Sequence, residues 1–501
     1  MNEKTKANII ANVLARVWGM VSLFVFIPFY IKYLGTDLYG LMSFFAVLQS
    51  IMMIMGAGFS ATLRREFSVF AENEEEKTKK HKLLNIVEKI YMVLAVTIIF
   101  LIYNLSDFIA ANWLNVGAIK ISIVSNSITL MGFSIGFQLL SNLYTGCLLG
   151  IGCQVKANVY QAIWSLLRNL FAIAAIIFIE PNIILFYLIQ IIIDFIYLCV
   201  LRIIIFKQLT LKKTYKLIFS DFKLLKDIWK YSVGILGITI ISTFNTKIDK
   251  IFVSNMFELK YVGAYSAGYA LSQIPSMLVS SIMVAIFNEF IYANSTKDVQ
   301  KQKELFYSYY KKIMIISICF SAYMALFSDE LLYFWLNNSA LVDIAKLPTS
   351  ILLVGSVFLT CQIVPYYYLL ASNNTLYNNI IGLAGIVLSL LILPYLSKKY
   401  GLVGTAIAYS VTMFISAIFL LLLTYRKYLL ASRIFCIRWI IFDNVIPFVS
   451  IFGIAFFSRT LISQYDLNIY LKIIYAIISG AITLFGSYYF FIVKFNSNKQ
   501  Y

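Results

Sequence analysis

The chain has 501 residues, of which 61% are hydrophobic and only 13% are charged. Apolar runs of about 18 residues or more recur from end to end, which excludes an ordinary water-soluble domain and indicates a protein that crosses a membrane many times. The net charge of +18 does not indicate a nucleic-acid-binding protein, because the Lys and Arg residues form no single patch and instead follow the loops between the apolar runs.

These runs predict fourteen transmembrane helices, since about 20 apolar residues cross a bilayer core of roughly 30 Å. The first is expected to be a retained span and not a secretory signal, because no small-residue cleavage site follows a short apolar core. In chain order the expected helices cover about 7–33, 41–63, 83–105, 121–149, 159–179, 183–205, 229–253, 261–287, 307–328, 346–370, 376–396, 402–424, 440–458 and 470–493.

The turn after the first helix has a counterpart in the second half of the chain. Ile27–Gly40 reads IPFYIKYLGTDLYG and Phe257–Ser266 reads FELKYVGAYS, so that Gly40 and Gly263 lie 223 residues apart. Ser43 and Ser266 have the same offset. Two such turns predict two parallel copies of one six-helix bundle, an internal repeat typical of transporters.

The predicted fold class is therefore all-α and integral to the membrane, with two six-helix lobes followed by two further helices. We expect an N-terminal lobe over 1–205, a lysine-rich cytoplasmic linker over 206–228, a C-terminal lobe over 229–424 and a C-terminal helix pair over 425–501. If the N-terminus is cytoplasmic, 29 of the 41 Lys and Arg residues fall on that side. The positive-inside rule then places both termini in the cytoplasm.

The sequence offers little for catalysis. The six cysteines have no paired spacing, the only histidine is His81 in a loop, and no phosphate-binding GxxxxGK[ST] segment occurs. Gly132–Gly136 matches the GxSxG elbow of serine hydrolases, but it lies within an apolar helix and is expected to serve helix packing. We predict no enzyme, no metal and no cofactor, and coupling to a proton or sodium gradient stays open.

The informative charged residues within the expected spans are Arg16, Arg168, Asp194, Lys247 and Asp249. Each costs at least about 2.5–3.5 kcal/mol near the bilayer centre, so each should face protein, water or a ligand. A structural ion pair between Arg168 and Asp194 is an equal alternative to a functional role, and Lys247 and Asp249 could instead reach the membrane interface. Polar residues that complete the set of cavity candidates are Asn12, Asn245, Tyr265, Tyr269 and Gln273.

Cationic groups in a cavity suit an anionic passenger, because arginine grips phosphate oxygens with two parallel hydrogen bonds and stays charged after desolvation. Tyrosine and asparagine side chains suit sugar hydroxyls. Tyrosine is also common at membrane interfaces, so this second indication is weak.

The two turn segments, IPFYIKYLGTDLYG and DKIFVSNMFELKYVGAYSAGYAL (Asp249–Leu271), together with the six-six-two pattern, resemble polysaccharide flippases of the multidrug/oligosaccharidyl-lipid/polysaccharide (MOP) exporter superfamily, and more narrowly Wzx-type O-antigen flippases. This resemblance implies a MATE-like fold, alternating access and an undecaprenyl-diphosphate-linked oligosaccharide as cargo. It also implies the bacterial inner membrane as location and lipopolysaccharide biosynthesis as role. A polysaccharide polymerase and a chain-length regulator are the protein partners it suggests.

Three alternatives stay open. The first two helices lack the arginine cluster expected of a lipid II flippase, and the first helix lacks the carboxylate common in cation-coupled drug exporters of the superfamily; both departures weigh against those functions without excluding them. A membrane polysaccharide polymerase or glycosyltransferase would need a large catalytic loop or a DxD motif, and the sequence has neither.

Overall fold

The computed structural model describes residues 3–68, 74–209, 223–295, 299–372, 374–429 and 440–494. This part of the chain is helical almost throughout and contains no strand; one isolated parallel bridge joins Asn115 and Glu258. The predicted all-α fold class is confirmed. The chain divides into two compact units, Met1–Gly263 and Ala264–Tyr501.

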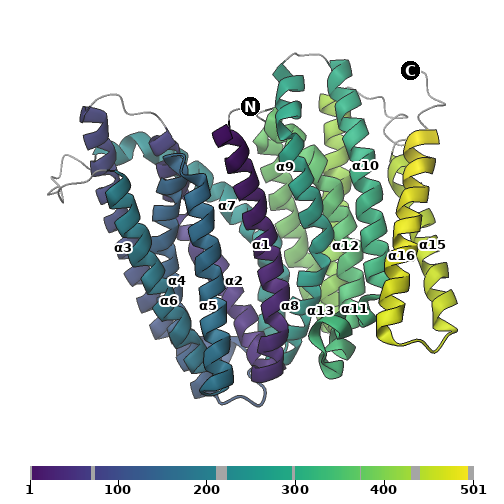
Figure 1. The fold of residues 1–501 in the computed structure, drawn as a ribbon, viewed down its shortest axis with the longest axis horizontal. Coiled ribbons are helices and arrows are strands. Elements are labelled where there is room, and N and C mark those ends of the chain that lie inside the picture. The colour runs from purple at the N-terminus through teal and green to yellow at the C-terminus, as the bar shows by residue number, and fades with distance from the viewer. Residues whose placement is uncertain are drawn as a thin grey trace. The chain divides into compact units, whose positions relative to one another are not determined.

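The first unit is built around α4, which packs against α2, α3 and α6 (Figure 1). Small residues make this close packing feasible, because a Cβ at Gly136 would lie 2.9 Å from Ile99 and one at Gly146 would lie 2.7 Å from Ser60. Its helices are α1 (Glu3–Leu34), α2 (Thr36–Ser68), α3 (Glu74–Phe108) with the π-helical η1 (Ile109–Trp113), α4 (Ile121–Gly150), α5 (Gln154–Phe178), α6 (Ile183–Gln208) and α7 (Lys223–Met256).

The second unit has its core between α10 and α12, where buried aromatic rings such as Phe306, Tyr310 and Tyr368 stack or meet edge to face. Its elements are the second half of α8 (Leu259–Ser272), α9 (Ile274–Ser295), α10 (Val299–Leu326), α11 (Ser328–Leu336), α12 (Ser339–Ala371), α13 (Thr375–Leu423), η3 (Thr424–Tyr428), η4 (Ile441–Val445), α15 (Ile446–Ser463), α16 (Ile469–Tyr488) and η5 (Tyr489–Lys494).

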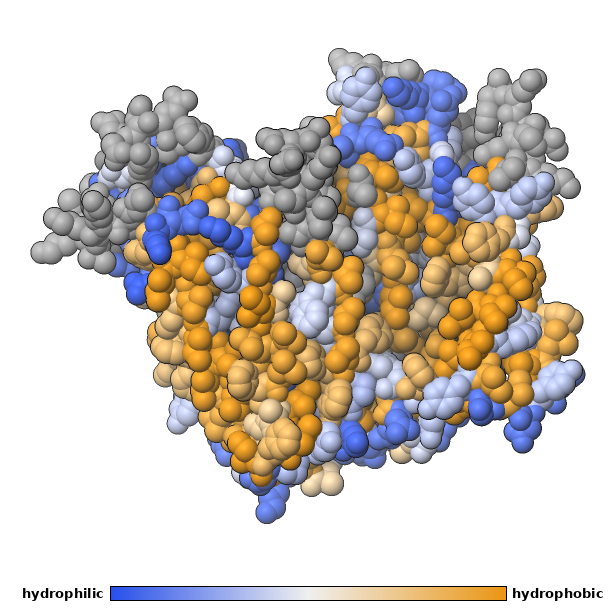
Figure 2. All heavy atoms as spheres, viewed as in Figure 1, coloured by the Kyte–Doolittle hydropathy of each residue, from blue (hydrophilic) through white to orange (hydrophobic). Residues whose placement is uncertain are grey.

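Eleven helical segments of the described chain are long and apolar enough to span a membrane, and α10 with α11, bent by 75°, would make a twelfth. Each of the fourteen expected ranges nevertheless falls on helical segments, although 261–287 includes the break at Gln273 and 307–328 includes the one at Phe327. The number of spans, twelve with the bent pair, is smaller than the fourteen expected for two reasons. Thr375–Arg426 is counted as one span although it holds two expected ones, and α7 is not among the eleven. Figure 2 shows apolar side chains over the middle of the visible helices and hydrophilic ones gathered toward their ends, as membrane-spanning helices require.

Glycine and proline residues account for two interruptions of the helices, one within α13 and one between α8 and α9. Gly401 has φ 62° and ψ −141°, a conformation open to glycine but not to other residues, and it divides α13 into two arms. The chain between α8 and α9 breaks at Gln273, just before Pro275, where the sequence predicts freed backbone groups. Pro28, inside α1, causes no such break.

The two repeat-related turns contact each other within the first unit. Gly35, with φ 84°, turns the chain from α1 into α2. A Cβ at Gly40 would lie 1.8 Å from the carbonyl oxygen of Leu259, and a Cβ at Gly263 would lie 2.9 Å from that of Thr36. Both glycines therefore allow the start of α2 and the start of α8 to approach with no side chain between them.

Helix α7 belongs to the first compact unit, because it packs along α2, with Ser232 hydrogen-bonded to Thr62 at 2.6 Å. The predicted division at 205 and 229 follows the repeat and not compactness, and it stays a prediction. Most of the expected linker, residues 210–222, lies outside the described residues, as do residues 430–439 of the C-terminal basic segment.

Candidate functional site

The first cluster of predicted site residues surrounds Asp194 of α6, whose side chain is fully buried in the first unit. Arg168 of α5 places its Nε 3.2 Å from Asp194 Oδ1, so these two residues form the ion pair that the sequence allowed. Trp164 Nε1 donates to the same oxygen at 2.9 Å. Ser134 Oγ and Gln138 Nε2, both from α4, donate to Oδ2 at 2.5 and 2.9 Å.

This arrangement gives a buried carboxyl group the partners that it needs inside a helical bundle. An isolated buried charge would cost many kcal/mol, and it is retained only where paired and hydrogen-bonded. Both oxygens of Asp194 have donors, and Arg168 adds a further contact from its Nη2 to Ser134 Oγ at 3.3 Å. The guanidinium also lies over the rings of Phe45 and Trp164, 5.7 and 5.6 Å from their centroids.

The Asp194 cluster extends toward α1 and α2. Gln49 of α2 donates to Gln138, and Tyr30 of α1 donates to Asn169 of α5 at 2.7 Å. Next to these, the hydroxyl of Tyr187 and Oε1 of Gln190 are buried on α6 and have no hydrogen-bond partner among the described residues. The first unit thus contains a polar layer that reaches every helix from α1 to α6 except α3.

Sequence reasoning missed most of this layer. Ser134 was assigned to helix packing, and Gln49, Gln138 and Trp164 were not singled out. A signal was present, because Ser134 and Gln138 lie one turn apart on the same face of a helix as apolar as α4.

For the predicted site residues of α1 and α7, the structure describes the side chains on α7 but not those on α1. Asn12 and Arg16 lie on α1, and their side chains are outside the described part of the structure. On α7, Asp249 is buried, with 2% of its surface exposed, while Asn245 and Lys247 are half-buried. Asn245 and Asp249, four residues apart, share one face of the helix, as predicted.

The three predicted residues around the α8–α9 break lie in the second unit. Tyr265 is fully buried, and Tyr269 packs edge to face on Tyr409, with ring centroids 5.9 Å apart. Gln273 sits at the break itself, and its Nε2 is buried without a hydrogen-bond partner in the described chain. Both tyrosines are buried in the packed unit, and Gln273 has a buried side-chain N–H donor that no described group accepts.

Three further ionic sites within helices were also missed, although charged residues in or beside the expected spans signalled them. Glu88 of α3 accepts hydrogen bonds from Tyr144 at 2.8 Å and Arg202 at 3.0 Å. In the second unit, Lys311 of α10 pairs with Asp443 of η4 at 3.2 Å. Arg459 of α15 contacts two carboxylates of α11, those of Asp329 and Glu330.

These sites hold buried, paired charges on several helices, and among the described residues no group of His, Cys, Asp and Glu could hold a metal ion. Residues 5–287 match the model of a family described as "Polysaccharide biosynthesis protein". The chain belongs to this polysaccharide biosynthesis family. It is a multi-pass membrane protein, and the predicted membership of a polysaccharide family is confirmed.

Individual relatives agree with the family. A Shigella flexneri protein described as "Putative O-antigen transporter" is 22% identical over 396 residues, which cover 77% of this chain and 90% of that protein. The lipid II flippase MurJ in an inward closed conformation superposes with a TM-score of 0.70 at 16% identity, covering 96% of this chain and 98% of that one. An inward-facing multidrug resistance MATE family transporter gives 0.65 at 13% identity, covering 82% and 94%. The two structures establish the MOP fold.

Proposed function

We propose that this protein is a flippase that moves an undecaprenyl-diphosphate-linked oligosaccharide, such as an O-antigen repeat unit, across the bacterial inner membrane by alternating access. The observation that carries the proposal is the family match over residues 5–287 on a chain with the MOP fold. The relative described as an O-antigen transporter supports the same cargo class. The two repeat-related lobes, 1–205 and 229–424, would be the bodies that move.

The diphosphate headgroup is assigned to Arg16, with Arg168 as a second contact. Arg168 is held by its ion pair with Asp194 and by the hydrogen bond from Nη2 to Ser134 Oγ but keeps further N–H groups, and 14% of its side chain is exposed. A guanidinium fixed in this way is already oriented for phosphate oxygens, so less conformational entropy is lost on binding. Asp194 then acts as a positioning residue for Arg168.

The glycan is assigned to polar faces of α1, α7 and α8. Asn12, Asn245 and Gln273 would offer amide groups to sugar hydroxyls, and the buried, unused Nε2 of Gln273 is the described group best suited to this role. Asp249 and Lys247 would complete the polar lining from α7. The prenyl chain would remain among the membrane lipids.

The cargo is proposed to cross chemically unchanged, so the protein is not assigned an enzymatic activity. Purified protein that joined glycan units without help would contradict this and favour a polymerase. A polysaccharide polymerase and a chain-length regulator are the proteins proposed to act on the cargo after its transfer. Proton or sodium coupling would appear as dependence of transport on the corresponding gradient.

The decisive experiment uses cells that lack the native gene and carry a plasmid copy. Arg16→Ala should abolish surface polysaccharide and cause lipid-linked oligosaccharide to accumulate in the cytoplasmic leaflet, with membrane protein level unchanged by immunoblot. Arg16→Lys, which keeps the charge but loses the planar fork, should retain partial export. Normal polysaccharide with Arg16→Ala would remove Arg16 from the site.

The same strains separate the alternatives within the superfamily. Loss of the gene should leave peptidoglycan synthesis and dye efflux unchanged if the cargo is an O-antigen-type glycan. Cell lysis with accumulated lipid II, or retention of fluorescent dyes, would instead identify a lipid II flippase or a drug exporter.

A further inference from the structure

The two arms of α13 form a helical hairpin that is closed at one end. Next to Gly401, a Cβ on Gly404 would lie 1.9 Å from the carbonyl oxygen of Leu396, so the backbones touch. Ser397 and Thr405 are hydrogen-bonded across the arms at 2.9 Å, and Ser389 and Thr412 at 3.2 Å. These contacts leave no space between the arms in this region.

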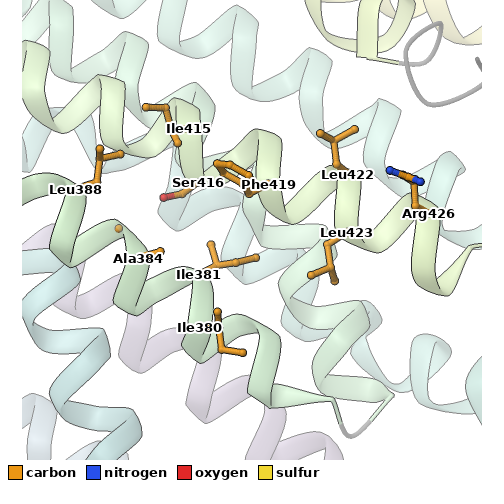
Figure 3. A pocket seen from close by; sticks show the side chains of 11 residues that line it. Ile380, Ile381, Ala384, Leu388, Ile415, Ser416, Phe419, Leu422, Leu423 and Arg426 are labelled. Atoms are coloured by element: carbon orange, nitrogen blue, oxygen red, sulfur yellow. The ribbon is translucent and has the colours of Figure 1, made fainter. Parts of the chain in front are cut away.

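Beyond Ser389 the arms separate and enclose a cavity of about 820 Å³. This volume is within the range of about 300–1,000 Å³ found for small-molecule sites. Figure 3 shows Ile380 and Leu388 on one arm facing Ile415 and Phe419 on the other, with Arg426 at the far end. Apart from Arg426 and Ser416, the lining side chains are apolar.

The cavity opens sideways, since Ile380 is 51% exposed and Phe419 is 62% exposed. Both lie on a segment, Thr375–Arg426, that is long and apolar enough to span the membrane. An exposed apolar surface at that depth meets lipid and not water. We call this space the groove; it lies between residues 380–388 of one arm and 415–426 of the other. Its occupant is therefore expected to have an apolar chain.

The length of the groove matches one leaflet. Ile380 to Leu388 spans about 12 Å and Ile415 to Arg426 about 16 Å, at roughly 1.5 Å rise per helical residue. Half of a bilayer core is about 15 Å. A chain that entered beside Arg426 would reach the closed part of the hairpin near the middle of the membrane.

Arg426 places a positive charge at the open end of the groove. Its side chain is exposed, and it has no ion-pair or hydrogen-bond partner within the described ranges. The next residue in the sequence, Lys427, is also basic. A guanidinium at the interface end of an apolar groove is suited to a phosphate group, and basic sites between transmembrane helices bind anionic lipid headgroups.

We propose that this groove is a binding site for an anionic membrane phospholipid, with an acyl chain between the arms of α13 and the phosphate on Arg426. The groove ends after one leaflet, which fits a diacyl lipid better than a much longer prenyl chain. The site is separate from the residues assigned to the cargo, and it does not depend on the proposed transport activity.

Native mass spectrometry of the purified full-length protein tests the site directly. Detergent-solubilised protein is mixed with phosphatidylglycerol or phosphatidylcholine, and the lipid-bound fraction is measured. Wild type should retain phosphatidylglycerol, and Arg426→Gln should weaken retention about tenfold, because one charge-assisted contact is lost. Lys399→Gln removes an exposed cation near the closed end of the same hairpin and should leave retention unchanged.

A second variant tests the apolar part of the groove. Ala384→Phe should fill the space between the arms and reduce phosphatidylglycerol retention while Arg426 remains. Its thermal unfolding in lipid-free detergent should match wild type, which separates loss of the site from loss of the fold. Unchanged retention in both Arg426→Gln and Ala384→Phe would overturn the proposal.

Two other occupants would give different results. Stronger retention of undecaprenyl phosphate, with displacement of phosphatidylglycerol, would overturn the proposal in favour of a prenyl-chain site. A dimer in the wild type that Ala384→Phe converts to a monomer would show that a second copy of the chain covers the groove. Equal retention of phosphatidylcholine and phosphatidylglycerol would remove the role given to Arg426.

Discussion

Four side chains surround the two carboxylate oxygens of Asp194 inside the first unit. Arg168 and Trp164 contact Oδ1, while Ser134 and Gln138 donate to Oδ2. Since the donors come from α4 and α5 and the acceptor from α6, this one residue joins three helices. The same contacts fix the guanidinium to which we assign part of the headgroup.

Removing the side chain of either Arg168 or Asp194 should therefore leave the other one buried without its ionic partner. We expect Asp194→Leu or Arg168→Leu to lower the free energy of unfolding by about 3–5 kcal/mol, and the double variant to recover most of it. Thermal unfolding in detergent would measure all three variants.

Export by the double variant then distinguishes the two roles of the pair. If Arg168 contacts the cargo, stability should return but surface polysaccharide should not. Recovery of both would show that the pair is only structural.

Sequence alone offered an ion pair of Arg168 and Asp194 as one of two equal alternatives, because charged groups in consecutive spans need partners. It could not predict Ser134 or Gln138 as their donors. A helical serine can satisfy itself on the carbonyl four residues earlier, as Ser141 does with Phe137 at 2.9 Å. Which serine turns outward depends on the rotation of α4 against α6, and only the packed structure fixes that rotation.

At the scale of elements, the contact between the starts of α2 and α8 depends on glycine. Gly40→Ala should separate these helices, because the added Cβ would lie 1.8 Å from the Leu259 carbonyl oxygen and backbone atoms must move. We expect a lower melting temperature and reduced export despite the better helix propensity of alanine. Gly237→Ala, on α7 with open space around it, is the matched control and should be neutral or stabilising.

The ion pair between Lys311 and Asp443 should matter for the attachment of the C-terminal helices to the rest of the second unit. Its side chains are only 8% and 11% exposed, so Asp443→Ala should cost several kcal/mol of stability. The pair of Lys346 and Asp343, 48% and 71% exposed, is the control, and Asp343→Ala should cost less than about 1 kcal/mol. Similar losses from both variants, measured by thermal unfolding, would contradict this difference.

Helix positions were predictable because apolar length is a strong signal, and every expected span falls on helix. Finer features of the helices could not be predicted from the sequence. The 75° bend between α10 and α11 has no proline to signal it, and apolar length does not signal the π-helical turns η1, η3, η4 and η5. The end of α13's first arm was expected near residue 396, whereas the structure breaks at Gly401, where the backbone needs positive φ.

For the whole molecule, the distribution of basic residues predicts the orientation in the membrane. Single cysteines replacing Lys120 and Asp466, both exposed in loops, should react with an impermeant maleimide added to spheroplasts. A cysteine replacing Lys301 at the start of α10 should react only after the membrane is opened. The reverse pattern would mean that both termini lie outside.

The division into moving bodies is a separate whole-molecule question. The repeat predicts a boundary before α7, while compactness places one between Gly263 and Ala264. The two criteria differ because α7 packs on α2 in this structure. A conformational change that transfers α7 from one body to the other would reconcile them, and it would expose Ser232 and Thr62, which are buried and hydrogen-bonded here.

The pairing of Arg168 with Asp194 also determines how this region responds to voltage. A transmembrane potential does about 2.3 kcal/mol of work per elementary charge per 100 mV, but the cationic and anionic members of a pair that move together cancel. Rearrangement of this cluster is therefore electrically silent. Any dependence of transport on membrane potential would have to come from charge carried by the passenger or from groups elsewhere in the chain.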